Sequence, residues 1–173
     1  MAQPISAGSL IGSDASVLYR SVYLSSMGYS LPVTTFKEKE LSKIQGAPVQ
    51  ALLSGMGYNR NMPKKVVFGP TRYGGIGIRY LYIKQVSQQA QHFIRNMRHQ
   101  GILGNNMWVT YQWFQVTTGT DYPVLEYPDT LKLPHAEGDW FIALQDFLSA
   151  SNLAIYIPNV YTVQFRRTRD REY

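Results

Sequence analysis

Apolar residues recur at intervals of three and four between Ile78 and Met97, and this period constrains the fold of the chain more than any other feature. Glutamine and arginine occupy many of the positions between them, and Gly101 follows shortly after the last one. An α-helix places apolar residues with this spacing on one face, and a glycine favours the end of a helix. We therefore predict a long amphipathic helix that ends near Gly101.

Two helices are predicted earlier in the chain. Asp14 is a candidate N-cap for a helix that Gly28 would end, because glycine adopts the left-handed backbone conformation common after a helix. Residues 35–38, Thr-Phe-Lys-Glu, have the form of a capping box before a second helix. Pro48 lies within that helix and cannot donate a backbone hydrogen bond. We expect two helical pieces or a kink near Gln45.

The rest of the chain has shorter elements, and the whole chain divides into three segments. In order, the residue pattern predicts a single turn over 63–67, a buried helix over 106–116, a long loop over 117–136, a helix over 138–149, and a hairpin of strands 153–157 and 161–165. By composition, we predict a flexible lead-in over 1–13, a helical basic domain over 14–116, and a segment over 117–173 with the loop, the last helix and the strands.

Net charge narrows the class of partner. The chain has 17 Lys and Arg against 11 Asp and Glu, a net charge of +6, which favours phosphate or an anionic membrane surface over an acidic protein face. It has no cysteine, so disulfides and thiolate zinc sites are excluded. No signal peptide is recognisable, and no apolar stretch approaches the roughly 18 residues of a membrane helix. We expect a soluble intracellular protein, in the nucleus or the cytoplasm, with no membrane role.

The distribution of charge is more informative than its sum. Residues 41–120 contain nine lysines and arginines and not one Asp or Glu, with tyrosines between them. Unpaired cations neutralise phosphates, and tyrosines stack on bases or sugars, so this tract predicts nucleic-acid binding. The alternative is a basic face neutralised by the acidic ends of the same chain. The candidate narrows to residues 58–79, where glycines and basic residues precede the long helix, and it includes Tyr58, Tyr73 and Arg79.

No catalytic or metal-binding motif is found. The glycine-rich residues 74–77 match neither the dinucleotide fingerprint, since Tyr80 stands where its last glycine belongs, nor the Walker A motif. A phosphate at the following helix N-terminus and a simple loop that allows helix entry are equal alternatives. His92 and His99 lie on one helix face, where a solvated pair is favoured over a metal site. We predict no catalytic residue, metal, cofactor or small-molecule substrate.

Several stretches resemble one protein family. They resemble the region downstream of the catalytic palm in retrotransposon-type reverse transcriptases, and the likeness spans roughly Val17 to the C-terminus. The stretches that carry it are Tyr-Ser-Leu-Pro at 29–32, Phe-Lys-Glu-Lys-Glu-Leu-Ser-Lys-Ile-Gln at 36–45, Met-Gly-Tyr-Asn-Arg-Asn-Met-Pro-Lys-Lys-Val-Val-Phe-Gly-Pro at 56–70, Tyr-Gly-Gly-Ile-Gly-Ile at 73–78, and Pro-His-x-Glu-x-x-Trp at 134–140.

The resemblance implies a fold and a function. In this family the region forms a helical thumb that leads into a connection segment, and the thumb grips the primer–template duplex. Together with the residue pattern, it implies a mainly α, thumb-like helical bundle with a long loop and a small C-terminal β-hairpin. It implies phosphate contacts at Arg60, Lys64, Lys65 and Arg72, and the palm and fingers of the parent polymerase as a second partner. The Tyr-x-Asp-Asp palm motif is absent, so no polymerisation by this chain alone is expected.

A second function class fits the same residues. The chain could instead be a protein-interaction or scaffold domain with a basic face, such as a domesticated retroelement remnant. Trp108, Trp113 and Trp140 would then be interface anchors, although tryptophans lie more often in a core.

Overall fold

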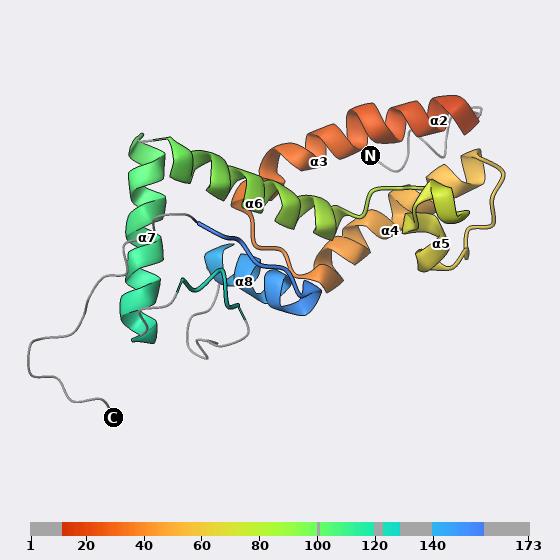
Figure 1. Cartoon of the computed structure of the whole chain (residues 1–173). Helices are drawn as coiled ribbons and strands as arrows, with labels where there is room; N and C mark the ends of the chain where they lie inside the picture. The colour runs from red at the N-terminus through yellow and green to blue at the C-terminus, as the bar shows by residue number, and fades with distance from the viewer. Residues whose placement is uncertain (1–11, 100, 120–122, 129–139, 158–173) are drawn as a thin grey trace, which may run out of the picture. The chain divides into compact units, whose positions relative to one another are not determined.

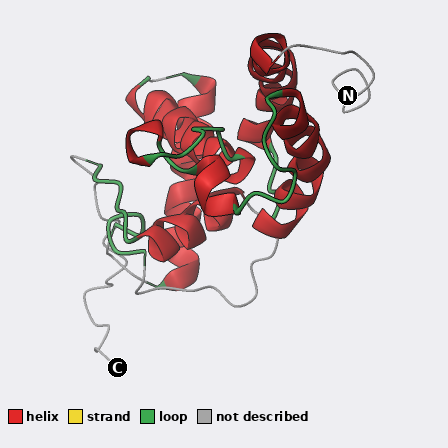
Figure 2. Ribbon diagram, turned by 90° about the vertical axis from the view of Figure 1, so that its right-hand side faces the viewer, coloured by secondary structure: helices red, strands yellow, loops and turns green. Residues whose placement is uncertain are grey.

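A computed structural model of the chain describes residues 12–99, 101–119, 123–128 and 140–157. Across these ranges the regular structure is helical and no strand is present (Figure 1, Figure 2). The predicted mainly α fold is confirmed. The chain forms two compact units, Met1–Gln89 and Ala90–Tyr173, which we call unit 1 and unit 2. The three segments predicted from composition do not coincide with this division and stay a prediction.

The described part of unit 1 begins with a helical run that continues past the expected end at Gly28. Its four pieces are α2 (Gly12–Leu18), the π-helical η1 (Tyr19–Tyr23), α3 (Leu24–Ser30) and the 3-10 helix η2 (Leu31–Val33). Asp14 lies in the first turn of this run and does not precede it. The prediction for Gly28 is wrong for a packing reason. A Cβ atom there would lie 2.9 Å from Cε of Lys84, so glycine makes room for the lysine side chain.

Helix α4 (Glu38–Gly55) begins two residues later than a capping box with Thr35 as its N-cap predicts. Its N-cap is Lys37, whose backbone N–H donates to Oε2 of Glu40 at 2.9 Å. The carboxylate that caps the helix therefore belongs to Glu40 and not to Glu38, because the acceptor has to lie at the third helical position.

Pro48 does not divide helix α4, which is continuous from Glu38 to Gly55. Of the two predicted alternatives, two helical pieces or a kink near Gln45, the first is wrong. Pro48 has no N–H to donate to the carbonyl oxygen of Ile44, four residues earlier. The hydroxyl of Tyr23 donates to that oxygen at 3.3 Å, so a side chain from η1 replaces the missing backbone bond.

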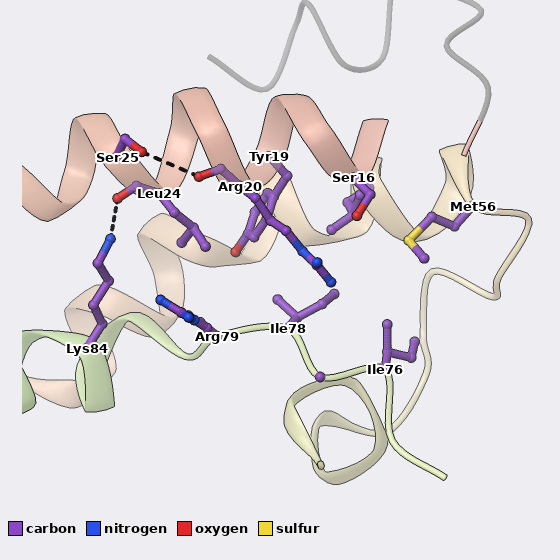
Figure 3. A pocket seen from close by; sticks show the side chains of 12 residues that line it. Ser16, Tyr19, Arg20, Leu24, Ser25, Met56, Ile76, Ile78, Arg79 and Lys84 are labelled. Carbon is purple, nitrogen blue, oxygen red and sulfur yellow. Dashed lines mark hydrogen bonds between the residues drawn. The ribbon is translucent and has the colours of Figure 1, made fainter. Parts of the chain in front are cut away.

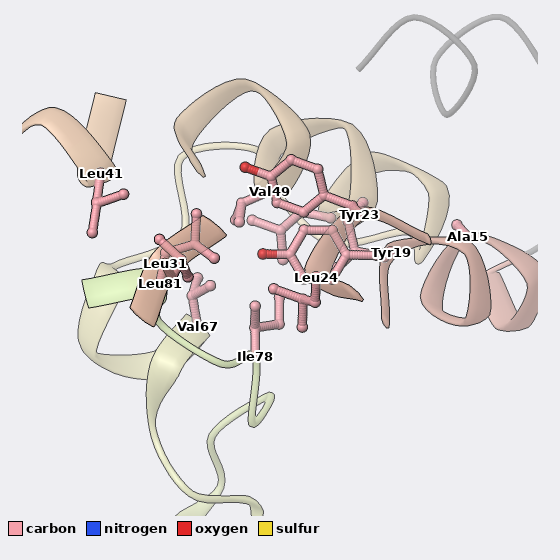
Figure 4. Close-up of a cluster of buried hydrophobic side chains, with 12 residues drawn as sticks. Ala15, Tyr19, Tyr23, Leu24, Leu31, Leu41, Val49, Val67, Ile78 and Leu81 are labelled. Atoms are coloured by element: carbon pink, nitrogen blue, oxygen red, sulfur yellow. The ribbon is translucent and has the colours of Figure 1, made fainter. Parts of the chain in front are cut away.

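Apolar side chains from the α-helices described in unit 1, with η1 and η2, meet in one core (Figure 4). The helical run and α4 supply most of it, and α5 (Lys64–Phe68) and the start of α6 (Leu81–Arg98) close it. The predicted turn over 63–67 is confirmed by α5, which follows Pro63 as its N-cap. The buried members of the core are Ala15, Tyr19, Tyr23, Leu24, Leu31, Leu41, Val49, Leu52, Leu53, Val67, Ile78 and Leu81.

Unit 2 is built around aromatic rings from three helices: the second half of α6, α7 (Ile102–Thr118) and α8 (Trp140–Ser151). The ring of Phe141 on α8 lies 6.0 Å from Phe93 on α6 and 5.0 Å from Phe114 on α7, between ring centroids. The long helix predicted from residue 78 and the last predicted helix are confirmed by α6 and α8.

The prediction that residues 106–116 are buried is wrong. Helix α7 buries Tyr111 and Phe114, while the side chains of Val109 and Trp113 are 62% and 52% exposed. A helix with apolar residues nearly all round packs only the face that its own unit covers.

The C-terminal part of unit 2 is only partly described. Residues 123–128, from the predicted long loop, and residues 153–157, the first predicted strand, have no regular secondary structure. The backbone N–H of Ile155 donates to the carbonyl of Leu125 at 2.9 Å, which joins these two segments. The second predicted strand, residues 161–165, lies outside the described residues. No helix in the described ranges is long and apolar enough to cross a membrane.

Candidate nucleic-acid interface

The predicted segment 58–79 folds back on itself between α4 and α6. Helix α5 is followed by the 3-10 turn η3 (Thr71–Tyr73), and residues 76–78 then run beside α5. The N–H of Ile76 donates to the carbonyl of Val66 at 2.9 Å, and the N–H of Ile78 donates to the carbonyl of Val67 at 3.1 Å. Val67 and Ile78 are buried, so the core holds both sides of this loop in place.

The glycines of this loop serve backbone packing. A Cβ atom on Gly75 would lie 2.8 Å from the Cα of Gly69, a distance that no side chain tolerates. Gly74 and Gly77 have φ angles of +80° and +73°, which glycine adopts at little cost. The geometry therefore accounts for the glycine-rich sequence without a bound phosphate.

Gln45 connects this loop to two helices through a buried amide. Its Oε1 accepts the N–H of Leu81 at 3.0 Å, and its Nε2 donates to the hydroxyl of Tyr19 at 2.8 Å and to the carbonyl of Arg79 at 2.7 Å. The first N–H of α6 is therefore taken by a side chain, which favours the simple-loop alternative over a phosphate at this N-terminus. Burial raises the pKa of the Tyr19 hydroxyl above its usual range.

The seven predicted site residues are all exposed to solvent. The guanidinium of Arg72 lies 4.7 Å from the ring centroid of Tyr73, and that tyrosine is 75% exposed. Nε of Arg60 donates to Oγ of Ser54 at 2.8 Å, and Nζ of Lys64 donates to Oγ of Ser42 at 2.8 Å. Lys65 and Tyr58 are exposed on α5 and just after α4, respectively.

Two hollows on unit 1 gather basic side chains. The Lys64 hollow, of about 290 Å³, is lined in part by Arg60 and Lys64. The Lys84 pocket, of about 400 Å³, is lined in part by Arg20, Arg79 and Lys84 (Figure 3). None of the described residues that line either hollow is acidic. The structure thus groups Arg60 with Lys64, and it groups Arg79 with two cations that were not predicted as site residues.

Lys84 is the most constrained cation of this surface. Its Nζ donates to the carbonyl of Leu24, and burial lowers the pKa of its ammonium group, with the charge of Arg79 lowering it further. Its location could have been predicted from the sequence, because it follows buried Leu81 by three residues and so lies beside the buried face of α6. Arg20 had no such signal, because it belongs to the first helix and lies outside the acid-free tract.

Among the described residues, no three His, Asp or Glu side chains lie close enough together to hold a metal ion. Comparisons of the chain with family models, with curated proteins and with solved structures find no match. The resemblance to reverse transcriptases therefore stays a prediction that the sequence motifs alone support.

Proposed function

We propose that the chain binds the sugar–phosphate backbone of a duplex or an RNA–DNA hybrid through unit 1. It would act as a non-catalytic thumb and connection fragment of a retroelement reverse transcriptase, in the nucleus or the cytoplasm, beside the palm and fingers of the parent polymerase. One observation carries the proposal. The basic side chains of segment 58–79 are exposed, and their hydrogen bonds and ring contacts within the described part of the chain go to serine and tyrosine, not to carboxylates.

Cations without carboxylate partners favour phosphate as a ligand. Each lysine or arginine that neutralises a phosphate releases a condensed counterion, and this gain depends on salt and not on base sequence. The exposed ring of Tyr73, held beside Arg72, supplies a flat surface on which a sugar or an unpaired base could stack.

The experiment is a salt titration of binding to fluorescent DNA duplexes and RNA–DNA hybrids of two unrelated sequences. We expect similar affinities for both sequences, with log affinity falling linearly against log salt concentration. Replacing Lys64 and Lys65 by alanine should flatten that slope by about 2, since each lost phosphate contact removes about one counterion.

The control is a chain with Lys37→Ala and Lys39→Ala, which makes the same change in net charge on exposed residues at the start of α4. It should change the slope much less than the Lys64 and Lys65 variant. Salt-independent binding, or an equal effect of both variants, would rule out the proposed interface.

A protein-interaction function is the second candidate, and the exposed face of α7 favours it. Ile102, Val109, Trp113 and Val116 are each more than half exposed, at spacings of seven, four and three residues. With Asn106 between the first two, they follow a coiled-coil seam in which a single polar residue sets the register. Helix α7 has no charged residue, so two copies of this basic chain can meet along it without facing like charges.

We infer a second copy of the chain as the partner on this face, which the oligomeric state tests. Sedimentation should find a dimer in the wild-type chain and a monomer in the Val109→Glu variant. Val17→Glu, which adds the same charge at an exposed valine of α2, should leave the dimer intact. A monomeric wild-type chain would remove this candidate.

A further inference from the structure

The Lys84 pocket has the size and walls of a small-molecule site. Its volume of about 400 Å³ lies within the usual range for ligand pockets. Three separate elements bring cations to it: Arg20 comes from η1, Arg79 from the residues just before α6, and Lys84 from α6 itself. In Figure 3, Arg20 extends from its helix toward Ile78.

No negative charge from a described lining residue balances the positive charges of this pocket. No acidic residue is among the described lining residues, and the Lys84 ammonium is held in place by its bond to the Leu24 carbonyl. The side chain of Lys84 also lies over Gly28, where any Cβ would displace it. The charge of Arg79 disfavours the charged form of Lys84, and an anion bound nearby would offset this repulsion.

Apolar side chains line the same pocket. Leu24, Ile76 and Ile78 are among them, and Ser16 adds a hydroxyl group. A ligand that fits both kinds of side chain carries an anionic group and an organic part. A phosphate monoester has nearly two negative charges and three terminal oxygen acceptors, so it matches three cations better than a single carboxylate does.

We propose that the Lys84 pocket binds a phosphate monoester, with the phosphate among Arg20, Arg79 and Lys84 and the organic part on Leu24, Ile76 and Ile78. A free mononucleotide and the phosphorylated 5′ end of a strand both supply this chemistry. The inference goes beyond the proposed function, because the pocket would bind a mononucleotide whether or not the chain grips a duplex.

The test compares inorganic phosphate, AMP and adenosine by calorimetric titration of the full chain at constant ionic strength. We expect saturable binding of phosphate, tighter binding of AMP, and none of adenosine. Arg20→Gln and Arg79→Gln should each weaken AMP binding by about tenfold or more, which is the usual loss for one charge-assisted hydrogen bond. Arg95→Gln, the same change at an exposed arginine of α6 outside the pocket and outside segment 58–79, should stay within about twofold.

The outcomes separate this inference from the proposed function. No saturable phosphate or AMP binding, equal binding of adenosine, or an equal effect of Arg95→Gln would overturn the pocket. Replacing Lys64 and Lys65 by alanine should weaken duplex binding and leave AMP binding unchanged. A duplex with a 5′-phosphate that binds more tightly than the same duplex without it, in the wild-type chain but not in Arg20→Gln, would identify a strand end as the source of the phosphate.

Discussion

Gln45 shows how one polar residue determines the arrangement around the candidate interface. It lies on the buried face of α4 between Leu41 and Val49, where the helical pattern would accept a leucine. Its amide instead joins Tyr19, Arg79 and Leu81 by three hydrogen bonds. Buried amides are costly unless they are paired, so this network permits one arrangement of α4 against the start of α6.

Gln45→Leu should lower the free energy of unfolding by about 2–4 kcal/mol, because its partners lose hydrogen bonds while volume is nearly kept. Urea unfolding followed by circular dichroism measures this loss. Gln50→Leu, on the same helix but exposed, should change the free energy by no more than about 0.5 kcal/mol. Equal effects at both positions would show that helix content and not the buried network is responsible.

At the scale of elements, helix α4 tolerates a proline because a neighbouring helix supplies the missing donor. The hydroxyl of Tyr23 occupies the carbonyl of Ile44 that Pro48 leaves free. Burial raises the pKa of Tyr23, so this hydroxyl keeps its proton over the ordinary pH range.

A double-mutant cycle tests this substitution of one donor for another. Tyr23→Phe should cost about 1 kcal/mol in the wild-type chain, the net value of an ordinary hydrogen bond. In a Pro48→Ala background it should cost clearly less, because the introduced alanine has a backbone N–H that can donate to the carbonyl of Ile44. The coupling energy comes from urea unfolding of the four proteins. Additive effects would mean that Tyr23 does not replace the proline's lost bond.

Two glycines on unit 1 should respond in opposite directions to alanine. Gly75→Ala should destabilise by about 1–3 kcal/mol, because its Cβ would overlap the backbone at Gly69. Gly46→Ala should stabilise by up to about 1 kcal/mol, because Gly46 lies inside α4 with open space at its Cβ position. Thermal melting of both variants measures this, and a stabilised Gly75→Ala protein would contradict the close approach.

The sequence predicts best the helices whose apolar residues repeat with a helical period, because this repeat determines which face packs. The α6 helix is amphipathic along its length, so its existence could be read from residues 78–97. The continuity of α4 could not, because the hydroxyl that compensates for Pro48 comes from a residue 21 positions before Ile44. The exposure of one face of α7 could not be predicted either, since burial of an apolar helix depends on which neighbours cover it.

The candidate site follows the same division. Exposure of the basic residues in segment 58–79 agrees with the unmixed charge of that tract. Arg20 joins Arg79 and Lys84 only because the first helical run folds onto the start of α6, a contact over a long stretch of chain. The exposure of these basic residues could thus be predicted from the sequence, but the pocket could not.

At the scale of the whole molecule, buried tyrosines in both units should make the free energy of unfolding vary with pH in the alkaline range. Burial raises the pKa of Tyr19 and Tyr23 in unit 1, and it raises the pKa of Tyr111 in unit 2 to about 12. In the unfolded chain a tyrosine ionises near pH 10. Above that pH the unfolded state releases protons that the folded state keeps, so the free energy of unfolding falls as pH rises.

Lys84 changes stability with pH in the opposite direction. The pKa of its ammonium group is lowered in the folded chain, chiefly by burial, so the folded state loses this proton first and gains stability as pH rises toward the unfolded value of about 10.4.

One partly exposed lysine does not offset three buried tyrosines. We therefore expect the chain to lose stability between about pH 9 and pH 12, with tyrosine ionisation measured by ultraviolet absorbance shifted above that of free tyrosine. Tyr111→Phe should reduce this loss without changing its onset, because Tyr19 and Tyr23 remain. A free energy of unfolding that stays constant or rises across this range would show that these hydroxyls are not buried in solution.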